Sequence, residues 1–180
     1  MKTCLIITGL GPLLGMALKT TSSPIAISFR VEESAANTFT QDRIDLQLNP
    51  LDNEVFLVYA IDLAPSPPDD VGAGSAVLAS VSTTSQTGIT GLENPNVLVR
   101  AERAIVSDGA VAVSFEHMAG ETPQADLDYI GIIASNDFFV QIQGQGNTAV
   151  RACAGRMWGA RAKADSSTYA ALVQSEVLSS

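Results

Sequence analysis

Charged side chains are scarce in this chain of 180 residues. Asp, Glu, Lys and Arg make up 16 % of it, whereas about 25 % is usual for soluble domains. Hydrophobic residues make up 46 %. A monomer of this composition would expose a large uncharged or apolar surface. We therefore expect other protein copies to cover part of it.

Basic residues are the scarcer of the two signs. Ten Lys and Arg face nineteen Asp and Glu, which gives a formal net charge of −9. Neutralising the phosphates of nucleic acid needs clustered basic side chains, and neither end of the sequence carries a basic arm. The sequence therefore predicts little direct binding of nucleic acid.

Histidine and cysteine are nearly absent. His117 is the only histidine, which excludes a multi-histidine metal site, and no nucleophile is matched to it in the pattern. Cys4 and Cys153 form neither a disulfide framework nor a CxxC motif. A Cys4–Cys153 bridge and a buried free thiol at Cys153 both stay open. We predict no enzyme activity, no catalytic residues, no metal, no cofactor and no small-molecule substrate.

The sequence instead shows period-two alternation of apolar and polar residues, which is typical of strands. Ile25, Ile27, Phe29 and Val31 share one face of the first run, and Ile44, Leu46 and Leu48 share one face of the next. Asp108-Gly109, between two such runs, predicts a hairpin. Further strands are predicted at 54–63, 75–84, 97–106, 110–118, 128–134, 137–144 and 148–160.

A helix is predicted at the end of the chain, over 166–178. Asp165, Ser166 and Ser167 can cap it, and its apolar stripe needs a docking partner, which is either this chain or another. About eight strands without helical crossovers predict an all-β fold. The expected form is an antiparallel two-sheet sandwich, an eight-stranded jelly roll with a short C-terminal helix.

Two segments make up the predicted domain organisation. Residues 25–180 form one β-sandwich domain with its helix, and residues 1–24 form an apolar N-terminal arm. Residues 1–18 also have the basic start and apolar middle of a signal peptide. Glycines and Pro12 interrupt this run, so we predict that it is retained. It is too short and too glycine-rich to be a transmembrane helix.

A subunit interface is predicted around the only tryptophan, Trp158, which three arginines flank. Tryptophan and arginine are the typical residues of interface hot spots, while a core tryptophan is the alternative. Strand geometry does not allow the three arginines to share one uninterrupted face. We also expect the helix stripe or the apolar residues 3–18 to dock on an adjacent subunit. The predicted interface residues are Arg151, Arg156, Trp158, Arg161, Tyr169, Leu172, Val173 and Val177.

The run from Ile44 to Phe56 and the closing segment from Tyr169 to Glu176 resemble coat sequences of phages or environmental viruses. Over residues 25–180 the order of features resembles the single jelly-roll capsid proteins of small or tailless icosahedral viruses. The chain departs from many of them because it lacks a basic N-terminal arm. The resemblance implies a structural protein, a major capsid subunit that self-assembles into an icosahedral shell. It implies assembly in the host cytoplasm, a place in the virion, partners that are copies of itself, with minor capsid proteins as further candidates, and no cofactor. Membrane contact stays open.

The alternative is a secreted or cell-surface β-sandwich, which would be a pilus or adhesin subunit or a glycan-binding module. Residues 1–18 would then be a true signal peptide, and the protein would be extracellular or at the cell surface. A glycan-binding module needs an aromatic platform. With aromatic residues at 6 % of the chain, one Trp and three Tyr, the sequence offers little material for one.

Overall fold

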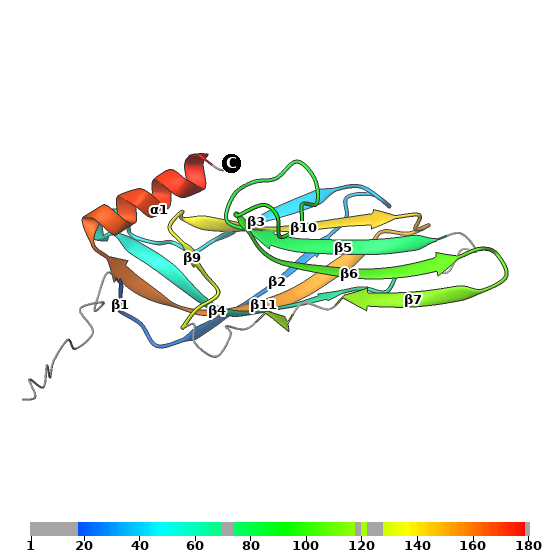
Figure 1. The fold of residues 1–180 in the computed structure, drawn as a ribbon, viewed down its shortest axis with the longest axis horizontal. Helices are drawn as coiled ribbons and strands as arrows, with labels where there is room; N and C mark the ends of the chain where they lie inside the picture. The colour runs from blue at the N-terminus through cyan, green and yellow to red at the C-terminus, as the bar shows by residue number, and fades with distance from the viewer. Residues whose placement is uncertain (1–17, 70–73, 118–119, 122–127, 179–180) are drawn as a thin grey trace, which may run out of the picture.

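Two antiparallel sheets pack face to face in the computed structural model, which describes residues 18–69, 74–117, 120–121 and 128–178 (Figure 1). The six-stranded sheet contains β1 (Leu18–Thr20), β2 (Ile25–Glu32), β4 (Glu54–Pro65), β8 (Gly120–Glu121), β9 (Gly131–Ile133) and β11 (Ala152–Ala164). The five-stranded sheet contains, in spatial order, β3 (Thr40–Asp45), β10 (Asp137–Gln145), β5 (Ser75–Ser82), β6 (Val97–Ser107) and β7 (Ala112–His117).

The strand pairing identifies the jelly roll. Eight strands remain when β1, β7 and β8 are set aside, and they form nested pairs in which the first strand pairs with the last and the second with the next to last. The pairs are β2 with β11, β3 with β10, β4 with β9, and β5 with β6. Such nested antiparallel pairs arise when one long hairpin is rolled into two sheets. The predicted fold, a jelly-roll sandwich with a short C-terminal helix, is confirmed.

The core lies between the sheets and depends on the two long strands β4 and β11. Alternation along β4 turns Phe56 and Val58 inward, but further along it is Ile61 and Leu63 that face the core. The register against β11 shifts at this point: Trp158 lies opposite Ala60, and Gly159 lies opposite Val58. A β-bulge with one extra residue in β4 explains how the apolar face changes parity there.

A polar layer lies on the part of the outer face of the five-stranded sheet that β3, β10 and β5 form. Gln141 of β10 is fully buried, and its amide donates to Ser82 Oγ at 2.7 Å and to Gln41 Oε1 at 3.0 Å. The same Gln41 oxygen accepts from the backbone N–H of Gln86 at 2.8 Å. Gln86 belongs to the loop 83–96, which joins β5 to β6 and folds back over the sheet (Figure 1). Uncharged amides and hydroxyls therefore fill the centre of this layer.

Helix α1 (Ser166–Leu178) begins where the sequence predicts. The carboxylate of Asp165 accepts from the backbone N–H groups of Ser167 and Thr168 at 3.0 and 2.8 Å, as an N-cap residue does. These bonds and those from the Ser167 and Thr168 hydroxyls hold the pKa of Asp165 at about 2. The helix lies against a second, smaller apolar cluster on β4 and β11. Its buried members are Val55, Leu57, Ala134, Ala162 and Ala164.

Several strand boundaries differ from the prediction. β3 ends at Asp45 because Gln47 has a φ of +51°, which no strand tolerates, although Leu46 and Leu48 are still buried. β11 runs to Ala164 instead of 160, because β4 and β1 both pair with its end: Glu54 lies opposite Lys163, and Leu18 lies opposite Ala164. β1 therefore lies within the predicted arm of residues 1–24, of which residues 1–17 are outside the described part.

Glu176 fastens α1 to the turn between β9 and β10. Its two carboxylate oxygens accept from the backbone N–H groups of Ala134 and Ser135, each at 2.9 Å. We expect Glu176→Ala to lower the free energy of unfolding by about 1–2 kcal/mol at pH 7, because two N–H groups lose their acceptor. Glu176→Gln keeps an acceptor oxygen without the charge and is the matched control. Urea unfolding at pH 7 measures both.

The same anchor predicts a pH dependence. Burial raises the pKa of Glu176 above its usual 4.5, because the charged form is poorly solvated there. The stability that this carboxyl contributes is fully present when the pH lies below the pKa of Glu176 in the unfolded chain. It is lost as the pH rises through the higher pKa of Glu176 in the folded protein. Wild-type protein should therefore gain stability relative to Glu176→Gln when the pH falls from 7 toward 4.5. An identical pH dependence of the two proteins would contradict this.

Candidate assembly surface

The side chain of Arg151 forms its contacts within the chain. Its guanidinium pairs with the carboxylate of Asp69 and donates to the carbonyl of Pro67 at 3.1 Å. The Arg151 side chain is 14 % exposed. Hydrogen bonds from Arg151 and Thr148 hold the pKa of Asp69 well below its usual range. Arg151 thus fastens the loop after β4 to the segment before β11.

Arg161 lies at the other end of β11 and is also held internally. Its guanidinium donates to the Glu54 carboxylate at 3.1 Å and to the carbonyls of Gln47 and Leu46 at 3.2 and 2.9 Å. It therefore fixes the irregular stretch that leads into β4. A short 3-10 helix, η1 (Pro50–Asp52), follows that stretch.

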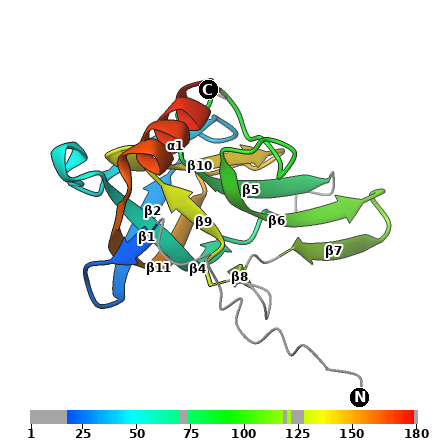
Figure 2. The same ribbon diagram turned by 60° about the vertical axis from the view of Figure 1, so that its left-hand side comes forward.

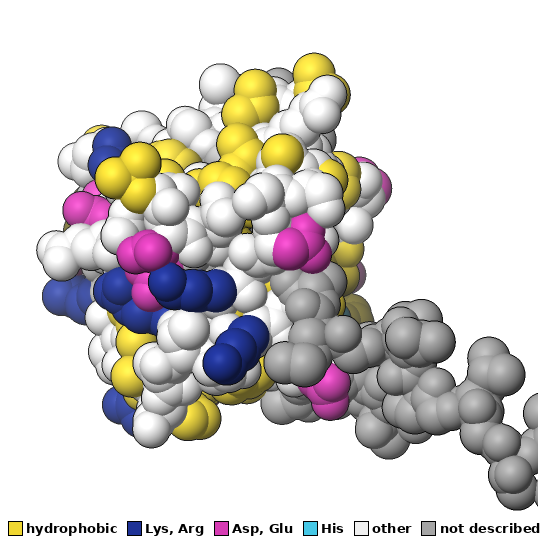
Figure 3. All heavy atoms as spheres, turned by 90° about the vertical axis from the view of Figure 1, so that its left-hand side faces the viewer, with side chains coloured by type: hydrophobic (Ala, Val, Ile, Leu, Met, Phe, Trp, Pro, Cys, Tyr) yellow, Lys and Arg dark blue, Asp and Glu magenta, His cyan; other side chains and the backbone are white. Residues whose placement is uncertain are grey.

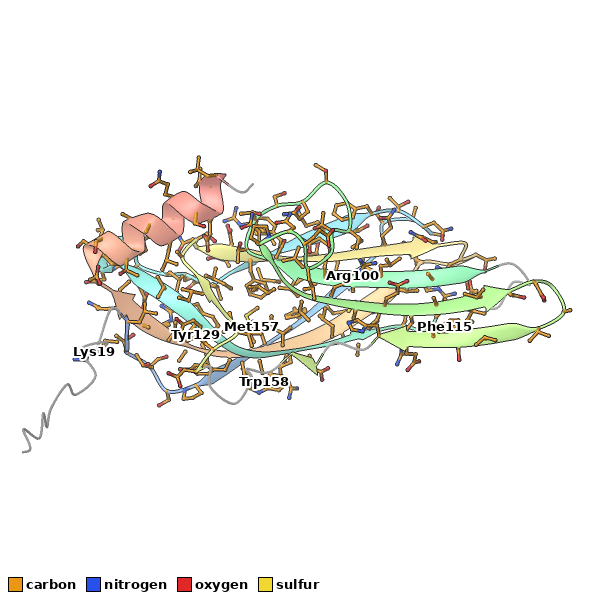
Figure 4. The ribbon with its side chains drawn as sticks, viewed as in Figure 1. Lys19, Arg100, Phe115, Tyr129, Met157 and Trp158 are labelled. Carbon is orange, nitrogen blue, oxygen red and sulfur yellow. The ribbon has the colours of Figure 1, made fainter. Side chains whose placement is uncertain are left out.

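Arg156 and Trp158 lie together on the outer face of the six-stranded sheet. The guanidinium carbon of Arg156 is 5.7 Å from the centre of the Trp158 ring, and its Nε donates to Ser28 Oγ at 3.2 Å. Figure 4 shows Met157 between the sheets and Trp158 on the opposite side of β11. The prediction that the three arginines do not share one face holds for Arg156 and Arg161, five positions apart on this strand.

A shallow hollow surrounds this pair. The hollow has a volume of about 430 Å³. It exists because small residues line it next to Arg156 and Trp158, namely Ala64, Ala154 and Gly155. Asp62 and Ser28 line the hollow as well, so it offers an aromatic ring, a cation, a carboxylate and a hydroxyl. Such a set of groups is suited to a polar partner or to a protein side chain.

The helix stripe divides into two parts. Tyr169, Leu172 and Val173 are half-buried against the cluster on β4 and β11, so these three have an intramolecular docking partner. Val177 is 65 % exposed. Figure 3 faces the end of the molecule where α1 lies, and hydrophobic side chains gather toward its top, above a band of charged ones. The role of all eight predicted residues in a subunit interface stays a prediction.

One exposed apolar feature that the sequence did not indicate is the β6–β7 ribbon. Val106, Val111, Val113 and Phe115 are 58, 64, 50 and 58 % exposed. Val106 pairs with Val113, and Ala104 pairs with Phe115, which places these side chains on one face of the ribbon. Figures 1 and 2 show the ribbon extending beyond the rest of the sandwich.

The predicted Asp108-Gly109 hairpin is confirmed at the tip of this ribbon. Gly109 has a φ of +89°, and the N–H of Asp108 donates to the carbonyl of Val111 at 3.3 Å. The alternation of Val111, Val113 and Phe115 was visible in the sequence. It did not indicate exposure, because a core strand has the same pattern.

Histidine, cysteine and carboxylate side chains are the residues of the described chain that could hold a metal ion or carry catalysis. Within ranges 18–69, 74–117, 120–121 and 128–178, no three His, Cys, Asp or Glu side chains gather to hold a metal ion. His117 lies on the exposed edge strand β7. Cys153 is buried, which raises the pKa of its thiol to about 12, whereas Cys4 lies outside the described residues. In the part of the chain that the structure describes, no helix is long and apolar enough to cross a membrane.

Comparison with known proteins gives little more. No protein-family model matches the chain, and no curated protein is similar to it in sequence. Among solved structures, a chain from Desmodium yellow mottle tymovirus aligns with 89 % of this chain and 88 % of its own length. The identity is 10 % and the TM-score 0.26, values that say nothing about what this chain does.

Proposed function

We propose that this chain is a structural protein that assembles with copies of itself, as a capsid subunit that forms the shell of a virion. The observation that carries the proposal is the β6–β7 ribbon, which presents an apolar face and an edge strand to solvent. A monomer seldom retains such a feature, because an exposed edge with apolar side chains recruits other chains.

Two further features support self-assembly. Trp158 and Arg156, the residue types that dominate interface energetics, lie side by side on an exposed sheet face. The jelly roll is a fold that viral capsid domains use, although lectins and cupins use it too. The proposal includes the division of the chain into an apolar arm, residues 1–24, and one sandwich domain, residues 25–180.

Sedimentation velocity of the full-length native protein at micromolar concentration tests the proposal. We expect a species much larger than the 18.8 kDa subunit. Because truncating a hot-spot residue costs about 2 kcal/mol or more, Arg156→Ala with Trp158→Ala should lower the association constant by about 30-fold or more. Circular dichroism should stay unchanged.

Arg43→Ala is the matched control for this double variant. Arg43 is 62 % exposed on β3, far from the hollow, and pairs with Asp137 at 2.7 Å. It should leave assembly unchanged. A stable native monomer would contradict the proposed function, and negative-stain images showing filaments in place of closed particles would contradict the capsid form of it.

One observation favours a second candidate, a secreted glycan-binding module. The hollow beside Trp158 combines an aromatic ring with Asp62, Ser28 and Arg156, and sugars are bound by rings together with such polar groups. The fluorescence of the single tryptophan would report binding. A saturable change with neutral oligosaccharides, in a protein that sediments as a monomer, would favour this candidate over the shell subunit.

A further inference from the structure

We propose that β7 is a two-fold contact, in which β7 of one copy pairs antiparallel with β7 of a second copy in a register centred on Ser114. This inference rests on the proposed function, because it names the surface through which copies of the chain meet. The two five-stranded sheets would join edge to edge into one continuous sheet.

The described edge strands differ in how they are protected. β8 has two residues, β1 and β9 have three each, and β3 carries Asp42, Arg43 and Asp45. β2 carries Arg30 and Glu32, which pair with each other at 3.1 Å. Short length and charge are the usual means of preventing strand addition.

β7 lacks this protection. It has six residues and contains neither proline nor lysine. Its one carboxylate, Glu116, forms an ion pair with Arg103 of the neighbouring strand at 3.3 Å, so the negative charge is balanced within the ribbon. Every residue of β7 is exposed. Among the described edge strands, β7 is therefore the one on which a further strand can add most readily.

The hairpin turn determines which backbone groups of β7 point outward. Asp108 and Val111 are hydrogen-bonded across the turn, and such pairs alternate along an antiparallel ladder. Since the register is unbroken from Ser107–Ala112 to Glu102–His117, Val113 and Phe115 direct their N–H and C=O groups toward β6. Ala112, Ser114 and Glu116 therefore direct theirs away from it, toward the open edge.

A two-fold axis at Ser114 uses all of these outward groups. Ser114 pairs with the partner's Ser114, and Ala112 pairs with the partner's Glu116, each as a hydrogen-bonded pair. Val113 then lies opposite the partner's Phe115 in the closer, non-hydrogen-bonded pair, and this contact occurs twice. The apolar faces of the two ribbons become one.

Charge and backbone parity exclude the neighbouring registers. An axis at Glu116 would set two carboxylates directly opposite each other, which is unfavourable. An axis at Val113 or Phe115 would require backbone groups that already face β6. An axis at Ala112 would move Phe115 beyond the end of the partner strand. The self-complementary register at Ser114 makes a second copy the occupant of this edge.

Single cysteines in a Cys4→Ser background test the register. The Cα atoms of a hydrogen-bonded antiparallel pair are about 5.5 Å apart, within the span of a disulfide. Ser114→Cys should therefore cross-link most of the protein into dimers on mild oxidation. Ala112→Cys alone and Glu116→Cys alone should give at least about tenfold less dimer, since each would lie about 13 Å from its own copy. Mixing those two variants should restore the cross-link. Cys153 is buried and does not compete.

Ser114→Pro provides a second readout that needs no disulfide. Its N–H faces the open edge, so proline should leave the subunit folded and weaken association about tenfold or more. Assembly that persists with Ser114→Pro, or particles in which Ser114→Cys does not cross-link, would overturn the β7 contact and leave the proposed function standing. A monomeric native protein would overturn both. Ser114→Cys in a chain that keeps Cys4 tests a competing occupant: a disulfide between these two positions would show that the N-terminal segment occupies the edge, which also overturns the proposal.

Discussion

Gly159→Ala is expected to lower the free energy of unfolding by about 3 kcal/mol or more. A Cβ atom at this position would lie 2.3 Å from the backbone oxygen of Leu57 and 2.3 Å from the Phe56 ring. Both belong to β4, the partner of β11 at the centre of the six-stranded sheet, and the Leu57 oxygen cannot move without breaking the ladder. Overpacking of a core commonly costs about 1–3 kcal/mol, and a clash with fixed backbone lies at or beyond the upper end.

Gly88→Ala is the control for this substitution. A Cβ atom at Gly88 would meet nothing within 4 Å. We expect its unfolding free energy to stay within about 0.5 kcal/mol of the wild-type value, as is usual for surface substitutions. Soluble yield and urea unfolding measure both variants. Wild-type stability in Gly159→Ala would show that the β4–β11 bulge relaxes more than its geometry suggests.

Glu33→Ala should be the second most damaging change, costing about 3 kcal/mol or more. Glu33 is 4 % exposed, and its two carboxylate oxygens accept from the N–H groups of Gly144 and Arg151 at 2.6 and 2.8 Å. Hydrogen bonds to charged groups contribute about 1.5–3 kcal/mol each, and the variant would leave two donors without an acceptor. The end of β10 and the start of β11 would then be held less firmly.

Glu32→Ala, one residue earlier, is the matched control. Glu32 forms an exposed ion pair with Arg30, and such pairs contribute about 0–1 kcal/mol. Thermal unfolding followed by circular dichroism compares the two variants. A similar small loss in both would mean that water replaces the Glu33 carboxylate at Gly144 and Arg151.

The fold was largely predictable from the sequence because its signals are local. Alternation such as Ile25 to Val31 depends only on which face of a strand is buried, and the capping role of Asp165 depends on residues two and three positions away. Together with the spacing of turns, these signals lead to an antiparallel sandwich with a terminal helix.

The candidate surfaces were less predictable because they depend on contacts between distant residues. The three arginines near Trp158 look alike in sequence, yet Asp69 and Glu54, roughly 80 and 110 positions away, engage Arg151 and Arg161. Phe115 has the pattern of a core residue, and it is exposed because its partner Ala104 lies on the face of β6 opposite to the core residue Ala101. The local periodicity of the sequence shows neither which distant carboxylate pairs with an arginine nor which face of a strand is exposed.

The amide layer around Gln141 gives the fold an uneven response to acid. Its members are amides, hydroxyls and backbone groups, none of which gains or loses a proton between acid and neutral pH. Carboxylates whose pKa is held low by their hydrogen bonds lie elsewhere: Asp69 accepts from Thr148, and Asp165 caps α1. Acidification that protonates Asp69 and Asp165 therefore weakens these two contacts, while the hydrogen bonds around Gln141 involve no group that titrates between acid and neutral pH.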